Sequence, residues 1–196
     1  INQTYPNVEY IIIDGGSTDE TMEIITTHEY EIDYWVSEKD NGIFEAMNKG
    51  IDLAFGEYIY FLNAGDEFVG CDILNDLIEI IRLDDKRHII YSGDVVLYRL
   101  REYICIANLY PWIPHQGAFI KTNIMKEYKF DTNFRIFGDL DLWKRLFKDG
   151  RYEYYKISKV ITKFELGGIG NNPRFTANRV REKWYYAKEH KDIWVF

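Results

Sequence analysis

A single aspartate in the string FLNAGDEF, residues 61–68, has the setting of a metal ligand. Asp66 follows an apolar run that is typical of a buried strand, and the small, polar run from Asn63 to Gly65 separates the two. Mg2+ and Mn2+ prefer carboxylate oxygens and leave positions open for phosphate oxygens. A cation at Asp66 could therefore offset charge on a departing diphosphate. The alternative is that Asp66 only caps the next turn.

A second aspartate has the setting of a general base. Asp139 lies at the start of GDLDLWKRLFKDG, residues 138–150, where the spacing of the leucines predicts a mostly buried helix. A carboxylate near a helix N-terminus is stabilised by the helix dipole, and a positioned carboxylate can accept a proton from an attacking hydroxyl. Asp141 should point elsewhere, because positions i and i+2 do not share a helix face. A plain N-cap role for Asp139 is the alternative.

Two further side chains could contact a charged ligand. His115, in the loop PWIPHQGAF, could contact a metal ion or a diphosphate, or could be a structural loop histidine. Lys49 follows Asn48 on a predicted helix. It could contact a sugar donor or neighbouring carboxylates, or could simply be solvated.

The elements that must position these residues alternate along the first 70 residues. The strings VEYIIID, IDYWVSE and EYIYFLN are typical of strands, and helical patterns lie between them. Ser17 and Glu20 have the spacing of a capping box, which predicts where the first helix begins. This alternation predicts an α/β fold with a mostly parallel central sheet flanked by helices.

Each predicted strand ends in acidic or small polar residues. The three endings are 14–17, 37–40 and 63–66, and they contain Asp14, Asp40 and Asp66. Ligands of parallel α/β sheets bind at the carboxyl ends of the strands. Three acidic loops at one rim therefore predict a binding site.

The second half of the chain is less regular. Residues 88–99 are typical of a strand or hairpin, and residues 152–166 of one or two strands. Residues 173–191 look helical and carry six Lys or Arg against Glu182 and Glu189. This segment is either a solvated helix face or a contact for a membrane surface or an anionic acceptor.

The composition excludes some classes of protein. The 196 residues suffice for one domain, and 46% hydrophobic with 29% charged residues is a globular balance. A net charge of -8 does not suit nucleic-acid binding. Cys71 and Cys105 form no disulfide framework, and no signal peptide or apolar run of about 18 residues is visible. We expect a cytoplasmic protein, with at most a peripheral contact on the inner face of the membrane.

Four strings together resemble the bacterial family 2 glycosyltransferases. They are DGGSTD (14–19), SEKDNGIFEAMNKG (37–50), HQGAFIK (115–121) and FGDLDLWKRLFKDG (137–150), and they occur in the order found in that family. The resemblance covers roughly residues 2–168 and is closest to the subgroup that builds surface polysaccharides. It implies a GT-A fold and an inverting transfer of a hexosyl group. The donor would be a nucleotide diphosphate sugar, the acceptor a hydroxyl of a glycan or lipid-linked glycan, and Mn2+ or Mg2+ would assist.

The resemblance also assigns roles to four aspartates. Asp14 matches the first family aspartate, at the nucleotide-base end of the pocket, and Asp40 matches the acidic position in the next loop. Asp66 falls in the metal-binding motif, and Asp139 matches the general base.

The sequence departs from the family pattern in three places. The metal motif lacks two of its usual carboxylates, so Asn63 or His115 would have to complete the metal site. Gly138 stands where many relatives carry an acidic or small residue, which leaves Asp139 alone at the base position. The chain also begins at INQTYPN, inside the family's first helix, so its first strand should be missing. A chain that truly began there should bind its donor poorly and expose a sheet edge.

We expect one GT-A-like domain over residues 1–196, in three parts. Residues 1–70 would bind the nucleotide sugar, residues 71–170 would hold the acceptor and the catalytic base, and residues 171–196 would form the basic helix. Two other functions stay open. A non-catalytic module that binds nucleotide sugars or carbohydrates would fit the reduced metal motif, and a sugar nucleotidyltransferase would need a Gly-rich, basic loop near its first strand.

Overall fold

The computed structural model describes residues 1–86, 88–99, 102–107, 113–148, 150, 152–166, 168 and 172–190, with the backbone alone at 99 and 102–107. The strands are β1 (Ile11–Asp14), β2 (Tyr34–Ser37), β3 (Tyr58–Ile59), β4 (Glu67–Phe68), β5 (Ile90–Arg99), β6 (Glu102–Ala107), β7 (Ala118–Lys121) and β8 (Tyr154–Glu165). The helices are α1 (Thr21–Thr27), α2 (Ile43–Leu53), α3 (Ile73–Leu83), α4 (Thr122–Tyr128), α5 (Gly138–Phe147) and α6 (Thr176–His190). Short 3-10 turns are η1 (Glu29–Glu31), η2 (His115–Gly117) and η3 (Pro173–Phe175).

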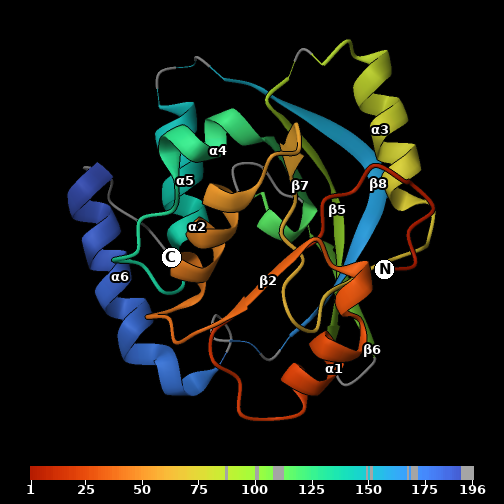
Figure 1. Ribbon diagram of the computed structural model, residues 1–196. Helices are drawn as coiled ribbons and strands as arrows, with labels where there is room; N and C mark the ends of the chain where they lie inside the picture. Colours follow the sequence, from red (N-terminus) through yellow and green to blue (C-terminus); the bar gives the residue numbers. More distant parts are fainter. Residues whose placement is uncertain are drawn as a thin grey trace.

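The helices lie on both sides of the long strands β5 and β8. Figure 1 shows α2, α4, α5 and α6 together on one side of these strands and α3 on the other side. The described residues confirm the predicted α/β class with flanking helices. Among them, no helix is both long enough and apolar enough to cross a bilayer.

The strand directions correct the prediction of a mostly parallel sheet. β1 and β2 pair in parallel as a two-stranded sheet, with Asp14 opposite Ser37. The larger sheet has the order β3-β7-β5-β8-β4, with β6 beside β5, and its parallel pair is β5 with β8. The other pairs in that sheet are antiparallel. β3 pairs with β7, which comes about 60 residues later, and apolar periodicity carries no information about such a partner or its direction.

Two apolar clusters cover the faces of the larger sheet. Along β7, Ala118 and Ile120 belong to the cluster that includes α2, α4 and α5, and Phe119 belongs to the cluster around α3. Neighbours on β5 divide in the same way, with Ile90 in the first cluster and Tyr91 in the second. Successive side chains of a strand point to opposite faces, so burial on both faces explains the continuous apolar runs in the sequence.

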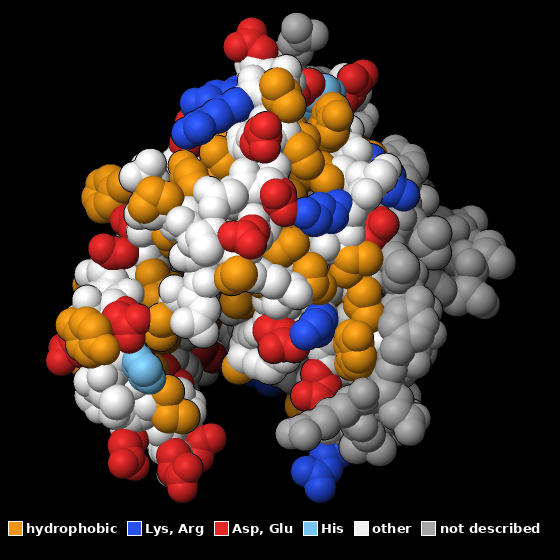
Figure 2. Space-filling model, turned by 90° about the vertical axis from the view of Figure 1, so that its right-hand side faces the viewer, with side chains coloured by type: hydrophobic (Ala, Val, Ile, Leu, Met, Phe, Trp, Pro, Cys, Tyr) orange, Lys and Arg blue, Asp and Glu red, His pale blue; other side chains and the backbone are white. Residues whose placement is uncertain are grey.

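The surface mixes charges of both signs. Figure 2 shows Lys and Arg side chains interspersed with Asp and Glu side chains on the face turned to the viewer. Surface lysines form ion pairs, among them Lys159 with Asp76 and Lys163 with Glu67. This mixed face is not a basic surface of the kind that binds nucleic acid.

Candidate functional site

The first candidate residue, Asp14, is a hydrogen-bonded anchor at the end of β1. The backbone N–H groups of Gly16 and Ser17 donate to Oδ2 at 3.0 and 2.9 Å, and the hydroxyls of Ser17 and Ser37 donate at 2.5 Å each. Hydrogen bonds from Ser17 and then Ser37 lower the pKa of this carboxyl to about 2. The Ser17 hydroxyl is therefore already hydrogen-bonded to Asp14. It does not cap the following helix, which begins at Thr21 with Glu20 as its N-cap residue, so the capping-box prediction was wrong.

Asp40 lies directly against the Asp14 loop. A Cβ at Gly15 would come within 2.5 Å of Asp40 Oδ2, so a larger residue there would have to push the Asp40 carboxylate aside. Asp40 Oδ1 accepts a hydrogen bond from the N–H of Gly42, the residue before α2, at 2.9 Å. The structure thus brings the loops after β1 and β2 together, as the sequence predicted.

Lys49, on α2, contacts the loop that follows β2. Its Nζ lies 2.8 Å from Glu38 and 3.8 Å from Glu45. The hydrogen bond to Glu38 is the main reason that the pKa of Lys49 is raised. Of the alternatives left open for Lys49, the structure shows contacts with neighbouring carboxylates rather than a merely solvated charge, and a donor contact stays a prediction.

Asp66 carries a buried oxygen that lacks a partner. Within the described part of the chain, Asp66 Oδ2 is inaccessible to solvent and accepts no hydrogen bond. Burial raises the pKa of this carboxyl to about 6, although His115 nearby opposes the rise. A buried carboxylate oxygen without a partner costs free energy, and a cation would remove that cost. Asp66 therefore fits a metal ligand. Among the described residues, the surroundings of Asp66 included, no group of three or more His, Cys, Asp or Glu is placed to hold a metal ion, so a cation here would need other ligands as well.

His115 joins the loop of Asp66 to the candidate base. Its Nε2 lies 2.9 Å from Asn63 Nδ2, and its Nδ1 lies 3.2 Å from Asp139 Oδ2. An amide nitrogen can only donate, so Nε2 accepts, and the ring proton lies on Nδ1 facing Asp139. The side chain is 11% exposed. Its 3-10 turn is held by Trp143, whose Nε1 donates to the carbonyl of Ile113 at 2.7 Å.

Asp139 occupies the first turn of α5, as predicted. Its side chain is 21% exposed, which leaves part of the carboxylate accessible to an acceptor. Gly138, just before it, lies against the ring of Phe44 on α2, where a Cβ would come within 2.6 Å of a ring carbon. Close packing of α5 on α2 thus explains the glycine at position 138.

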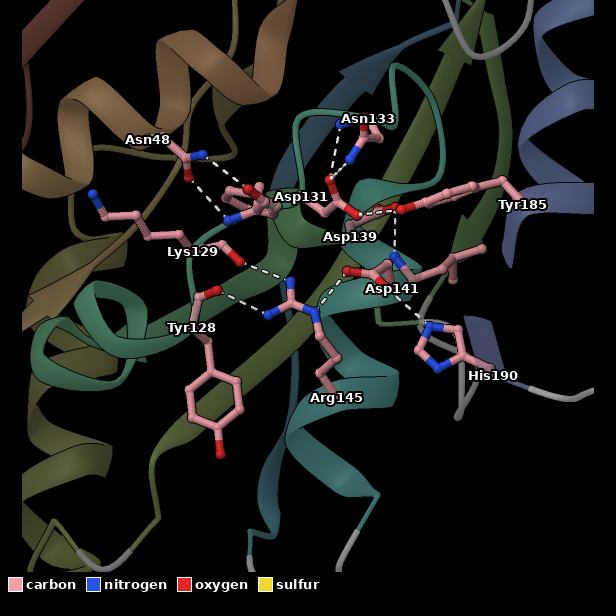
Figure 3. Close-up of polar contacts among 12 residues, drawn as sticks. Asn48, Tyr128, Lys129, Asp131, Asn133, Asp139, Asp141, Arg145, Tyr185 and His190 are labelled. Atoms are coloured by element: carbon pink, nitrogen blue, oxygen red, sulfur yellow. Dashed lines mark hydrogen bonds and ion pairs between the residues drawn. The ribbon is translucent and has the colours of Figure 1, made fainter. Parts of the chain in front are cut away.

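Asp141 faces away from Asp139, as its spacing predicted. Asp141 accepts a hydrogen bond from Arg145 Nε at 2.7 Å and lies 2.9 Å from His190 Nε2 (Figure 3). The other guanidinium nitrogens of Arg145 donate to the carbonyls of Tyr128 and Lys129 at 2.8 and 2.7 Å. This network ties α5 to the end of α4 and to α6, so Asp141 has a structural role.

The contacts join the candidate residues into two groups. One group contains Asp14, Asp40 and Lys49, and the other contains Asn63, Asp66, His115 and Asp139. The start of α2 contacts both, through Gly42 beside Asp40 and through Phe44 against Gly138. The role of each residue in a binding or catalytic site stays a prediction.

Sequence reasoning missed a buried acidic residue on α6. Glu182 is 5% exposed and accepts hydrogen bonds from the three backbone N–H groups of residues 135–137. Glu182, Tyr186 and His190 follow one another at intervals of four and have little exposed surface. This spacing was a signal that they share an inward face of the helix.

Known proteins resemble the chain in sequence. The family model described as glycosyl transferase family 2 matches residues 1–138. An uncharacterized glycosyltransferase of Mycobacterium tuberculosis is 26% identical over 178 residues, which cover 84% of this chain and 66% of the relative. The amylovoran biosynthesis glycosyltransferase AmsB of Erwinia amylovora is 29% identical over 188 residues, or 84% of this chain and 62% of AmsB. The chain thus spans slightly less than two thirds of the length of these two relatives.

Solved structures share the fold. The crystal structure of S. aureus TarS 1-349 in complex with UDP-GlcNAc matches with a TM-score of 0.68 and 14% identity, over 85% of this chain and 52% of that chain. The complex of the same TarS fragment with UDP matches with a TM-score of 0.67 and 14% identity, over 86% of this chain and 55% of that chain. This likeness confirms the expected GT-A type of fold. The family match over residues 1–138 shows that the chain belongs to glycosyl transferase family 2.

Proposed function

We propose that this chain transfers a sugar, with inversion, from a nucleotide diphosphate sugar to a hydroxyl of a glycan or lipid-linked glycan in cell-surface polysaccharide synthesis. The family membership supports a glycosyltransferase. Relatives named for PGL/p-HBAD and amylovoran biosynthesis support the surface-polysaccharide role. The solved structures of TarS with UDP and UDP-GlcNAc support a nucleotide-sugar donor.

One observation carries the proposal. A single imidazole, His115, contacts both Asp139, the proposed base, and Asn63, which lies in the loop of Asp66. The contact supports the proposal, because it brings Asp139 beside the loop of Asp66, which would hold the metal and the leaving diphosphate. A transferase needs this proximity, because the acceptor oxygen must attack while the diphosphate departs.

In this reaction, a displacement at the anomeric carbon, each residue has a separate role. Asp139 takes the proton from the acceptor hydroxyl, and the oxygen forms a bond to the anomeric carbon on the face opposite the diphosphate. The bond between that carbon and the diphosphate oxygen breaks, and the nucleoside diphosphate leaves with the electron pair. His115, which donates from Nδ1, holds the Asp139 carboxylate in one orientation.

In this proposal, residues 1–70 would bind the sugar donor and residues 71–170 would bind the acceptor. Asp14, Asp40 and Lys49 would contact the nucleotide and its sugar. Asp14 is suited to this because its carboxylate is already fixed by four hydrogen bonds before any ligand binds.

A divalent cation, Mn2+ or Mg2+, would be held by Asp66. Asn63 or His115 would supply a second contact, for which the two side chains would have to release each other. The cation would neutralise charge on the leaving diphosphate, which an acidic pocket would otherwise repel.

The test is the variant Asp139→Asn, assayed with a panel of nucleotide sugars and Mn2+ in the full-length protein. We expect transfer to fall by about 100-fold or more, because a positioned base contributes roughly that much, while donor binding measured by calorimetry is retained. Turnover close to that of the parent would remove Asp139 as the base. A parent protein that binds donors without turning any over would favour the non-catalytic alternative.

We also propose that α6 contacts an anionic membrane surface. Trp184 is 78% exposed and Val180 is 58% exposed, and both lie on the same face of α6 as the exposed side chains of Arg181 and Lys188. An exposed Trp between basic residues suits a lipid headgroup region. The predicted segment 173–191 reaches Lys191, which lies outside the described residues.

Sedimentation with vesicles tests this contact. The parent protein should bind vesicles that contain anionic lipid, and Trp184→Ala with Arg181→Glu should reduce the bound fraction. Equal binding to purely zwitterionic vesicles would contradict the charge argument.

A further inference from the structure

Glu182 binds the backbone just before Asp139, the candidate base. Its Oε1 accepts from the N–H of Arg135 at 2.8 Å, and its Oε2 accepts from the N–H groups of Ile136 and Phe137 at 2.9 and 3.1 Å. Three consecutive backbone donors thus converge on one carboxylate from a helix about 45 residues further along the chain. Asp139 follows Phe137 by two residues.

The carboxylate is buried and lies where α5 lacks a cap of its own. Glu182 is 5% exposed. Phe137 is the N-cap residue of α5 and provides no side-chain hydrogen bond to the helix. A negative charge near this end of the helix is favourable because the N-terminus of a helix carries a partial positive charge. Glu182 therefore supplies, from another helix, the anchoring that the local sequence does not provide.

Neighbouring contacts hold the same segment to the same face of α6. Tyr185 packs edge-on against the buried ring of Phe134, with 5.1 Å between ring centroids. His190 lies 2.9 Å from Asp141, one turn of α6 beyond Tyr186 (Figure 3). Residues on both sides of Asp139 are thus fixed by α6.

We propose that Glu182 is a positioning residue for the sugar transfer: it fixes residues 135–137 and so places Asp139 in its contact with His115. The inference rests on the proposed function, in which Asp139 is the base. Glu182 touches no reacting atom. Its effect would pass through the backbone, because a shift of residues 135–137 would move the first turn of α5 away from the 3.2 Å contact with His115.

The variants Glu182→Gln and Glu182→Ala separate the carboxylate from the bulk of the side chain. Glutamine keeps one acceptor oxygen but turns an NH2 group toward one of the three backbone donors, and alanine removes every acceptor. Glu189→Gln is the matched control, because it removes an equal charge from an exposed position on the same helix. The readout is nucleoside diphosphate released in the full-length protein, with Mn2+ and the donor of a nucleotide-sugar panel that gives the fastest turnover.

We expect kcat to fall about 10- to 100-fold in Glu182→Ala, since a misplacement near 1 Å can cost that much, and to fall less in Glu182→Gln. The donor KM should stay within about twofold, because the donor contacts are on other elements. Glu189→Gln should match the parent.

A second control tests whether a loss of stability alone could lower kcat. Tyr186→Leu loosens the buried face of α6 without removing the bonds to residues 135–137, so it should lower Tm and leave kcat unchanged at 25 °C. The inference is overturned if Glu182→Ala and Glu182→Gln keep the parent kcat, if donor KM rises in step with the loss, or if Tyr186→Leu loses as much turnover. If the parent releases no diphosphate from any donor, or if Asp139→Asn turns over normally, the proposed function fails first and the inference falls with it.

Discussion

Removing the charge of Asp66 should stabilise the metal-free protein. In the described chain, the buried Oδ2 of Asp66 accepts no hydrogen bond, and burial raises the pKa of this carboxyl from 3.8 to about 6. At pH 7.5 without metal, the folded protein must hold this carboxyl in its charged form. Asp66→Asn replaces that charged group by a neutral side chain of the same shape, so the variant should be more stable than the parent.

The pKa of Asp66 determines how much stability Asp66→Asn should gain and over which pH range the gain should appear. A folded pKa about two pH units above the unfolded value corresponds to about 3 kcal/mol at most, and partial exposure to solvent reduces this to about 1–2 kcal/mol. Between about pH 4 and pH 6, the folded state keeps a proton that the unfolded chain has lost. The parent therefore loses stability as pH rises through this window and loses no more above it. The advantage of the variant should be absent at pH 4 and complete at pH 7.5.

Urea unfolding in EDTA at pH 4, 5.5 and 7.5 measures the difference. At pH 7.5, a gain of about 1–2 kcal/mol would raise Tm by roughly 2–8 °C for a chain of this size. Asp76→Asn is the control, because Asp76 is exposed and paired with Lys159, so its removal should bring no gain. An Asp66→Asn protein that is less stable than the parent at pH 7.5 would refute the reasoning, because Oδ2 would then have a partner.

Two other substitutions test the site's framework. Asp14→Asn should cost about 1–2 kcal/mol at pH 7, because the hydrogen-bonded carboxyl with a pKa of about 2 stabilises the fold above pH 4 and loses this contribution as pH falls toward 2. Urea unfolding at pH 7 and pH 2.5 should show a clearly smaller cost at the lower pH, and an equal cost at both would contradict it. Gly138→Ala should cost about 1–3 kcal/mol by overpacking against Phe44, and pairing it with Phe44→Leu should recover part of the loss in a double-mutant cycle. Strict additivity of the two changes would show that the contact does not limit the packing.

The first sheet and the helices near the site could be predicted from the sequence because their signals are local. Continuous apolar runs located β1 and β2, and the spacing of apolar residues located α2 and α5. The direction of β7 could not be predicted in this way. It pairs with both β3 and β5 in the antiparallel sense, and such pairing depends on how the chain returns to the sheet rather than on the strand's own pattern.

The sequence named the candidate site residues but not the contacts between them. Asp14 is bound by Gly16 and Ser17, two and three residues further on, so these contacts lie within the motif that is visible in the sequence. The contacts of His115 link residues 52 and 24 positions apart, and no local pattern specifies them. Glu182 was missed because an acidic residue in a basic helix looks like a solvated charge unless its spacing from Tyr186 is weighed.

If the proposed function is right, the contacts of His115 would link metal binding to the orientation of Asp139. Nδ1 faces Asp139, and Nε2 accepts from Asn63, so both ring nitrogens are already engaged. His115 can join Asp66 as a metal ligand only if Asn63 releases Nε2, whereas the contact with Asp139 can persist through that exchange. Asn63, if it binds the metal through its own oxygen, must likewise turn its amide nitrogen away from the ring. Either second ligand thus changes the hydrogen bond that fixes the tautomer of His115, and hence the proton that orients Asp139. In the proposed function, the loop of Asp66 and Asp139 would therefore act as one coupled unit, although the sequence places them more than 70 residues apart.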